Sequence, residues 1–489
     1  MLHRTILTIA FAICAITVQA QVDDFRAQYE AFRQNAIKQY QDFRDEANQR
    51  YAEFREDAWR RFHEMPAKEK PKEEQVPPVV VPDDEPLPEP IDSNPLPIEE
   101  VITTPKPEPQ PEPIQPIEEQ PVQRDNTLTF TYCGTECRVR IPLDASLAIP
   151  TPTIDVLNSA WLKLAGDDFD NTIHDCLELR KSLQLSDWAY LNLIAALSVQ
   201  YYGEGNNARL FTAFVYNQSG YKMRLARSGN NIYLLYASQH EILEKPYYQL
   251  DDGNYYVLGP RLGDIEIYNM PYPKEKPMSL YIPTNQRFAF NASEQRTLSS
   301  KRYPAVSVTI DVNRNLIDFY DTYPTSLIND NFMTRWAMYA NTPLDNEVVA
   351  ELYPKMRDYL TDLSPLDAAN VLLNWVQTAF VYAYDDEVWG GDRAFFAEES
   401  LYYPYCDCED RSILFSRLVR DLLDLDVVLV YYPGHLATAV CFADNVPGDY
   451  IELRGRRFII ADPTYFGAPV GRTMPNMDNA AAKVILLRR

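Results

Sequence analysis

The chain has 489 residues, more than one hydrophobic core usually organises, so we expect two or three folded units. Its 33 tyrosines and 21 phenylalanines indicate that much of the chain buries a substantial core. The formal net charge of −24 argues against electrostatic binding to nucleic acid or to anionic lipid, because either would repel the chain.

Residues 1–20 have the pattern of a secretory signal peptide. After a basic start, an apolar run extends from Ile6 to Val18, and small residues precede the expected cleavage site before Gln21. Cys14 lies inside this run but lacks the small residue that a lipoprotein signal places just before its cysteine. No later stretch approaches about 18 apolar residues, so we expect an exported protein without a transmembrane span.

Residues 21–65 carry an 11-residue repeat and are predicted to form a long amphipathic helix. Its three apolar slots hold Tyr29, Tyr40 and Tyr51, then Phe32, Phe43 and Phe54, then Ala36, Ala47 and Ala58. Steps of three and four residues place these side chains on one stripe of the helix. Because the helix cannot bury its own stripe, we expect a homo-oligomer through residues 24–62, or contact with another domain, a partner or a membrane. Self-association is preferred, since the polar face mixes both charge signs.

Residues 66–125 are dominated by Pro, Glu, Gln and Val. This composition is typical of an extended, disordered linker. We therefore expect a spacer that holds the helical stalk away from the globular part.

Residues 126–260 are predicted to form an α+β domain. It opens with a β-hairpin in which Cys133 and Cys137 form a disulfide if the compartment is oxidising; two reduced, packed cysteines are the alternative. A helical stretch over 154–202 follows, with Ser186 as a helix cap. The segments YKMRLAR, NIYLLYAS and NYYVLG then alternate with turn sequences and predict antiparallel strands.

Residues 261–343 continue as a β-rich region, with candidate strands IEIYNM, SLYIP, RFAFNA and AVSVTIDV. Residues 344–489 differ, because helices come first and an antiparallel sheet follows. Helices are predicted over 346–363 and 365–381 and after Cys408, and strands over DVVLVYYP, HLATAVCF and RRFIIADPTY.

The residues that carry chemistry lie in this last part. Asp407 is a good N-cap and Asp410 occupies the capping-box position, so a helix is predicted to begin at Cys408, where free N–H groups and the helix dipole favour a thiolate. His435 follows a Pro-Gly turn at the start of one strand, and Asp462 ends another. This order can bring a nucleophile, an imidazole and an orienting carboxylate together at one edge of a sheet.

These motifs resemble a known family. Cys408-Glu409-Asp410, GHLATAV and Asp462-Pro463-Thr464 are similar to the transglutaminase-like superfamily, close to its bacterial cysteine-proteinase branch, over roughly residues 345–475. The resemblance implies a papain/transglutaminase-like domain with helices packed on an antiparallel sheet, with Cys408 as nucleophile, His435 as acid and base, and Asp462 as orienting group. With the signal peptide, it also implies the periplasm, the outer membrane or the exterior of a Gram-negative-type bacterium.

Three features of the site leave alternatives open. Cys406 replaces the glycine usual in the family two residues before the nucleophile, and it either exerts redox control on Cys408 or merely packs. The oxyanion donor is the Cys408 backbone N–H or the Gln377 side chain. Zinc bound by Cys406, Cys408, His435 and Cys441 is disfavoured because C-x-C lacks the usual ligand spacing, and neither a metal nor a cofactor is expected.

Residues 186–260 share the helix-strand-strand order of residues 408–465. They are interpreted as a possible degenerate copy of the same fold, in which residues 208–217 are helical rather than a strand. Glu204-Gly205-Asn206 would then occupy the place of the nucleophile, and His240 would survive.

The sequence therefore predicts an exported cysteine peptidase or amidase that acts on a protein or peptide substrate through an acyl-thioester. Hydrolysis is preferred, because water is the default acceptor unless a site excludes it. The alternatives are a protein cross-linking transamidase, a catalytically silent envelope scaffold for adhesion or assembly, and an enzyme that is silent until a partner or reductant opens the site.

Overall fold

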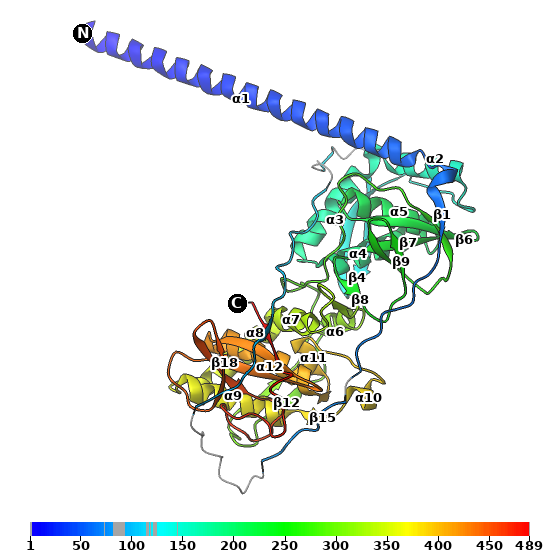
Figure 1. Cartoon of the computed structure of the whole chain (residues 1–489). Helices are drawn as coiled ribbons and strands as arrows, with labels where there is room; N and C mark the ends of the chain where they lie inside the picture. The colour runs from blue at the N-terminus through cyan, green and yellow to red at the C-terminus, as the bar shows by residue number, and fades with distance from the viewer. Residues whose placement is uncertain are drawn as a thin grey trace.

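The computed structural model describes residues 2–72, 74–81, 93–113, 117, 119–120, 125–143 and 145–488. The fold is α+β, with antiparallel sheets and covering helices. Figure 1 shows a long N-terminal helix that projects from two globular bodies. We call these bodies the N-terminal half, residues 125–290, and the C-terminal half, residues 296–488. Among the described residues, no helix combines the length and the apolar character needed to cross a membrane.

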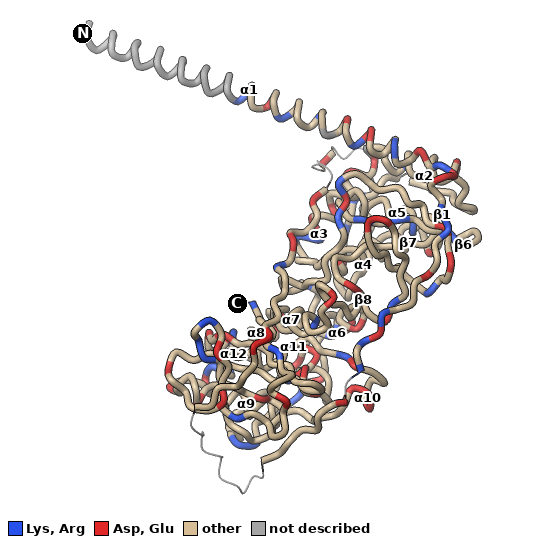
Figure 2. The backbone as a smooth tube through the Cα atoms, in the orientation of Figure 1, with Lys and Arg blue, Asp and Glu red and all other residues tan. Residues whose placement is uncertain are grey.

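The long helix α1 (Leu2–Ala52) ends before the predicted repeat is complete. Figure 2 shows both charge signs along its described part. Early in the stripe, the side chain of Tyr29 is 61% exposed, whereas Tyr51 is only 3% exposed. The Tyr51 ring lies 4.5 Å from the Trp161 ring, inside the N-terminal half.

The helix predicted over residues 21–65 is therefore too long at its C-terminal end. The chain leaves the helix after Ala52 and passes through η1 (Glu56–Ala58) into β1 (Trp59–Phe62). Phe54 is buried against Tyr268, with ring centroids 4.5 Å apart. Burying this aromatic side chain in the N-terminal half outweighs continuing an exposed stripe. Self-association of the remaining exposed stripe stays a prediction.

The disordered linker predicted over residues 66–125 is wrong for its described residues. β2 (Asn94–Pro95) pairs with β19 (Asp449–Leu453), and β3 (Glu100–Ile102) pairs with β21 (Lys483–Leu486). Leu96 and Ile98 are buried against the C-terminal sheet. These apolar side chains explain why the segment follows the globular surface instead of standing away from it.

The N-terminal half combines helices with an antiparallel sheet. Its helices are α2 (Ile154–Leu164), α3 (Asp170–Ser182), α4 (Asp187–Tyr202) and α5 (Asn206–Gln218). The sheet has the strand order β1-β11-β6-β7-β10-β9, from β6 (Met223–Ser228), β7 (Asn231–Ala237), β9 (Tyr247–Leu250), β10 (Gly253–Val257) and β11 (Ile265–Tyr268). The predicted strands are confirmed, as is the cap, since the Ser186 hydroxyl accepts the Ala189 N–H at 3.3 Å.

The predicted hairpin forms, but its disulfide does not. β4 (Asp125–Tyr132) and β5 (Thr135–Pro142) are joined by a two-residue turn, Cys133-Gly134. Cys137 is opposite Phe130 in the ladder, whereas Cys133 lies in the turn, so the two are not a cross-strand pair. Both are free thiols.

Residues 261–343 do not form the separate β-rich region that the sequence predicts. β11 joins the N-terminal sheet, and β12 (Arg296–Ser299) pairs only with β13 (Ser307–Ile310) among the described strands. The segments SLYIP and RFAFNA lie outside any strand, and α6 (Arg314–Tyr320) and α7 (Thr334–Asn341) are helical. Leu280 and Phe288 are buried without a ladder, so their apolar character reflects core packing rather than strand formation.

The C-terminal half has helices that precede its sheet, as predicted. After α6 and α7, its helices are α8 (Asn346–Leu360), α9 (Pro365–Ala379), α10 (Asp385–Val388), α11 (Ala397–Tyr402) and α12 (Cys408–Leu423). The sheet has the order β2-β19-β20-β18-β17-β21-β3, with β17 (Asp426–Tyr432), β18 (His435–Cys441) and β20 (Arg456–Ala461) at its centre. β14 (Ser326–Leu327) pairs with β8 (Glu241–Ile242), and β15 (Val381–Tyr382) with β16 (Tyr405–Cys406).

The two halves share one topology. In each, a helix leads into a strand pair with a two-residue turn, α5 to β6-β7 and α12 to β17-β18. The order β11-β6-β7-β10-β9 corresponds to β21-β17-β18-β20-β19, and all these pairs are antiparallel. Residues 208–217 are helical, as the repeat interpretation requires. His240, however, follows the far end of β7 and does not correspond to His435, which opens β18.

Candidate active site

The helix α12 places Cys408 at its first position. Asp407 is the N-cap, and its carboxylate accepts the Glu409 N–H at 3.2 Å. Asp410 completes the capping box by accepting the Asp407 N–H at 3.2 Å. The predicted helix start is thus confirmed. The helix begins here because two carboxylates accept hydrogen bonds from N–H groups at its N-terminus.

The sheet places an imidazole and a carboxylate beside this helix end. His435 opens β18 directly after the Pro433-Gly434 turn, and Asp462 follows β20. His435 Nε2 lies 2.9 Å from Asp462 Oδ2, and both residues are buried. Asp462 Oδ1 accepts the Thr464 N–H at 2.8 Å, which fixes the carboxylate. The imidazole is held by one nitrogen and keeps the other for a different partner.

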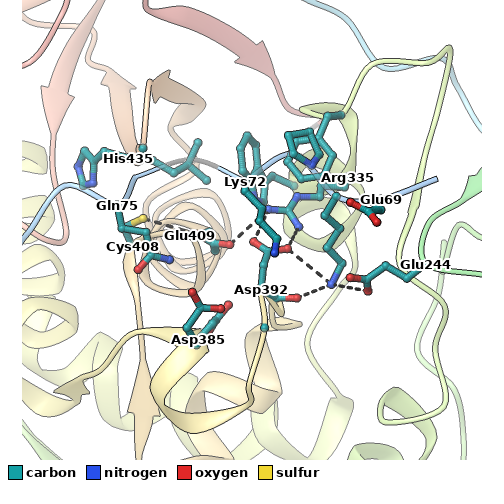
Figure 3. Close-up of a pocket in the computed structure, with 18 of the residues that line it drawn as sticks. Glu69, Lys72, Gln75, Glu244, Arg335, Asp385, Asp392, Cys408, Glu409 and His435 are labelled. Carbon is teal, nitrogen blue, oxygen red and sulfur yellow. Dashed lines mark hydrogen bonds and ion pairs between the residues drawn. The ribbon is translucent and has the colours of Figure 1, made fainter. Parts of the chain in front are cut away.

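Cys408 and His435 line the same cavity, which has a volume of about 550 Å³. The Cys408 thiol donates to Glu409 Oε2 at 3.5 Å, and the Leu436 backbone N–H, next to His435, lowers the pKa of this thiol. His435 Nδ1 is buried and has no hydrogen-bond partner among the residues that the structure describes. Figure 3 shows the two side chains at the same end of the cavity. Nδ1 is thus the imidazole nitrogen without a partner among the described residues, in the cavity that the Cys408 thiol also lines.

The thiol itself is not activated in this state. Burial, followed by the neighbouring carboxylates of Asp407 and Glu409, raises the pKa of Cys408 well above its ordinary value. The Leu436 N–H lowers this pKa but does not offset the increase. The predicted preference for a thiolate at the helix N-terminus is therefore outweighed, because a low-dielectric site with two carboxylates disfavours a further negative charge.

An acidic wall, formed by Asp385, Asp392 and Glu409, lines the same cavity as Cys408, and Glu409 accepts a hydrogen bond from its thiol at 3.5 Å. Arg335 is buried beside it, 2.8 Å from Asp392 Oδ1 and 3.5 Å from Glu409 Oε1. Burial and Glu409 raise the pKa of Asp385 to about 8. The sequence analysis missed Asp385, Asp392 and Arg335 as site residues; the acidic run around Asp385 was the only signal for them.

Several of these side chains come close enough to share a metal ion. The ligand atoms of Asp385, Asp392 and Glu409 lie within 4.8 Å of one another, as do those of Asp407, Cys408 and Glu409. Carboxylate oxygens suit Ca²⁺ or Mg²⁺ rather than zinc. Because Arg335 already pairs with two of these carboxylates, the chain itself balances much of their charge, and we assign no metal here.

Gln377 is wrong as an oxyanion candidate. Its Nε2 donates to the carbonyl oxygens of Asp462, Tyr465 and Ala468 at 3.0, 2.8 and 3.1 Å. Its Oε1 accepts the Gly467 N–H at 3.1 Å. The amide is thus fully used in tying α9 to the loop that carries Asp462, so Gln377 positions that loop instead of facing a substrate.

The other cysteines do not join the site. Cys406 is buried in β16 beside Arg411, and burial raises its pKa despite the guanidinium. Cys441 ends β18 at the opposite end from His435 and packs in a separate apolar cluster. Cys406, Cys408, His435 and Cys441, the disfavoured zinc set, are therefore not one cluster, because Cys441 lies at the far end of β18 from His435. Cys406 and Cys408 are both free thiols, and the structure favours the packing role for Cys406.

Of the predicted site residues, the structure brings together Cys408, His435 and Asp462, whereas Gln377 and Cys406 have structural contacts. No protein-family model matches the chain, and no curated protein matches it either.

Proposed function

We propose that this chain is a thiol enzyme that cleaves an amide or peptide bond through Cys408, with His435 as acid and base and Asp462 as the orienting carboxylate. The observation that carries the proposal is the His435 ring, bonded to Asp462 at 2.9 Å through Nε2 and left with an unpaired Nδ1 in the cavity that Cys408 lines. A buried imidazole with one fixed nitrogen and one free nitrogen suits proton transfer.

The chemistry follows from these positions. His435 Nδ1 takes the thiol proton, and the Cys408 sulfur attacks the carbonyl carbon of the substrate. The same nitrogen then protonates the leaving amine as the carbon–nitrogen bond breaks, which leaves an acyl-thioester on Cys408. Water, deprotonated by His435, attacks the thioester and releases a carboxylic acid and the free thiol. The Cys408 N–H is the proposed oxyanion donor, because N–H groups at a helix N-terminus lack an intrahelical acceptor.

The same proposal includes the family and the location. A helix that begins with a cysteine and packs on an antiparallel sheet with the imidazole at a strand start supports a papain/transglutaminase-like fold. The signal-peptide pattern supports export to the envelope of a Gram-negative-type bacterium. The proposed family rests on the sequence motifs together with the topology of α12, β18 and β20. The proposed location rests on the signal-peptide pattern and on the same motifs.

The test is acyl transfer to Cys408 in the full chain. We expect 4-nitrophenyl acetate to give a burst of nitrophenol and an acetyl group on Cys408, seen by peptide mass mapping. Cys408→Ala should lose the burst, and His435→Ala should slow it at least about 100-fold, while Cys406→Ala and Cys441→Ala should retain it. Hydrolysis of casein, followed by mass spectrometry, checks amide cleavage with the same variants. An unchanged burst in Cys408→Ala would overturn the assignment.

A further inference from the structure

A segment that the sequence analysis treats as a spacer crosses the candidate active site. We call residues 66–72 and 74–81 the strap. Figure 1 shows it running from the N-terminal half across to the C-terminal half. Figure 3 shows its side chains among those of the site. The strap residues that line the cavity with Cys408 and His435 are Ala67, Glu69, Lys70, Pro71, Lys72 and Gln75.

The strap is held by main-chain hydrogen bonds on both sides of the cavity. Upstream, the Met65 N–H donates to Tyr247 O at 2.8 Å. In the middle, the Val76 N–H donates to Gly434 O at 3.0 Å, one residue before His435. Downstream, the Val81 N–H donates to Phe466 O at 2.8 Å. Backbone pairing of this kind does not depend on sequence, so another extended peptide could use the same acceptors.

Gly434 shows how closely the strap approaches the site. Its φ is +75°, and a Cβ placed there would lie 2.0 Å from the Glu74 carbonyl oxygen. The turn that presents His435 therefore accommodates the strap only because this residue is glycine. The thiol beneath is buried, and this burial is the largest cause of its raised pKa.

A lysine of the strap enters the acidic wall. The Lys70 side chain is 11% exposed, and its Nζ lies 3.1 Å from Glu244 Oε2 and 3.6 Å from Asp392 Oδ2. Nζ also donates to the Asp392 carbonyl oxygen. Apart from the strap, the described lining carries Arg335 as its one cation and, as carboxylates, Glu244, Asp385, Asp386, Asp392 and Glu409. Without the strap, these acidic side chains would have no ammonium group to pair with. A basic side chain of another peptide is therefore favoured at the position of Lys70.

We propose that the strap occupies the cleft in which an extended peptide substrate binds, that Lys70 fills a subsite for a basic side chain, and that the chain inhibits itself until the strap is displaced. The peptide nature of the substrate rests on the proposed function. A competing ligand would form the same backbone hydrogen bonds at Gly434 and Phe466 and would place a lysine or arginine between Glu244 and Asp392.

The experiment measures binding in the absence of turnover. A fluorescein-labelled peptide of residues 66–78 is titrated into full-length Cys408→Ala protein, with anisotropy as the readout. Adding Lys70→Met to the chain should tighten binding at least about tenfold, because the strap then occupies the cleft for less of the time. Lys72→Met is the matched control, since Lys72 lines the cavity but forms no ion pair with the residues that the structure describes, and it should leave the affinity unchanged. A labelled peptide that itself carries Lys70→Met should not show this tighter binding to the Lys70→Met chain.

A second readout uses the native thiol. Lys70→Met should increase the rate at which iodoacetamide alkylates Cys408 at least about tenfold over Lys72→Met, because exposure makes the thiolate easier to form. Cys176, buried in the N-terminal half, should stay protected and so report that the fold is intact. Equal affinities and equal alkylation rates in both variants would overturn the inference. Neither readout requires catalysis, so a failure of acyl transfer in the Lys70→Met chain, with these gains present, would contradict only the proposed function.

Discussion

The two halves of the molecule use one topology for different ends. In the C-terminal half, the helix-start residue is Cys408, and the Leu436 N–H lowers the pKa of its thiol. In the N-terminal half, the helix-start residue is Asn206, whose Oδ1 accepts the Ile232 N–H at 2.8 Å. Asn206 Nδ2 also donates to Asn230 O at 2.8 Å. In both halves a polar side chain thus begins the helix, and in the N-terminal half it serves as the acceptor of a strand N–H.

The other two positions of the site also differ between the halves. Asn231 opens β7 where His435 opens β18, and Leu258-Gly259-Pro260 follows β10 where Asp462-Pro463-Thr464 follows β20. The N-terminal half therefore keeps the framework without an imidazole or a carboxylate at these places. The comparison teaches that the topology positions three side chains, while their identity decides whether chemistry is available.

The largest expected effect separates the two helix-start residues. Cys408→Ala should lower acyl transfer by at least about 10³-fold, since the nucleophile is lost. Adding Asn206→Cys to that variant should restore nothing, because the N-terminal half offers no imidazole at Asn231. The burst assay with 4-nitrophenyl acetate measures both. Recovery of activity by Asn206→Cys would break the distinction between the halves.

The next effect concerns the carboxylate. Asp462→Asn should reduce kcat about 10²- to 10⁴-fold with little change in KM, because the His435 ring loses the anion that orients it and stabilises its protonated form. Steady-state kinetics and the pH profile of kcat distinguish this from a loss of folding. Asn231→Ala, at the corresponding strand start of the N-terminal half, should leave kcat within about twofold.

A smaller effect concerns the buried amide that fixes the catalytic loop. Gln377→Leu should lower the free energy of unfolding by about 2–4 kcal/mol, because three buried carbonyls lose their donor. It should also lower kcat, since Asp462 belongs to the loop it holds. Gln218→Leu is the matched change in the N-terminal half, where Gln218 Nε2 donates to Asn48 and Tyr272. Gln218→Leu should lower the free energy of unfolding but leave kcat unchanged. Denaturant unfolding and steady-state kinetics of both variants test this difference.

The smallest effect, when taken per pH unit, is a pH dependence of stability. Burial raises the pKa of Glu398, in the C-terminal half, to about 8. The folded state then holds a proton that the unfolded state releases, so stability is greatest below the unfolded pKa and falls as pH rises toward about 8. Glu398 should contribute up to about 1.4 kcal/mol per pH unit to the slope, and Glu398→Gln should remove this contribution. Urea unfolding at several pH values measures this, with exposed Glu136→Gln as the control expected to keep the slope.

The sequence alone determined those features that depend on neighbours a few residues away. Capping by Asp407 and Asp410 located the start of the helix at Cys408, and apolar alternation located the strands that present His435 and Asp462. The helix-strand-strand order also indicated the related topology of the N-terminal half. In each case the physical signal, a cap or a period-two pattern, acts within one element.

Only the tertiary structure decided which distant groups meet. Gln377 binds the Asp462 loop, Cys133 and Cys137 are free thiols, and α1 ends just before Phe54, which packs in an aromatic core. The strap lies over the site because it contacts both halves: the Gly434 carbonyl oxygen accepts its Val76 N–H, and Glu244 pairs with its Lys70. Burial and long-range pairing depend on residues that are distant in the sequence and close in space. Local sequence patterns do not identify those residues.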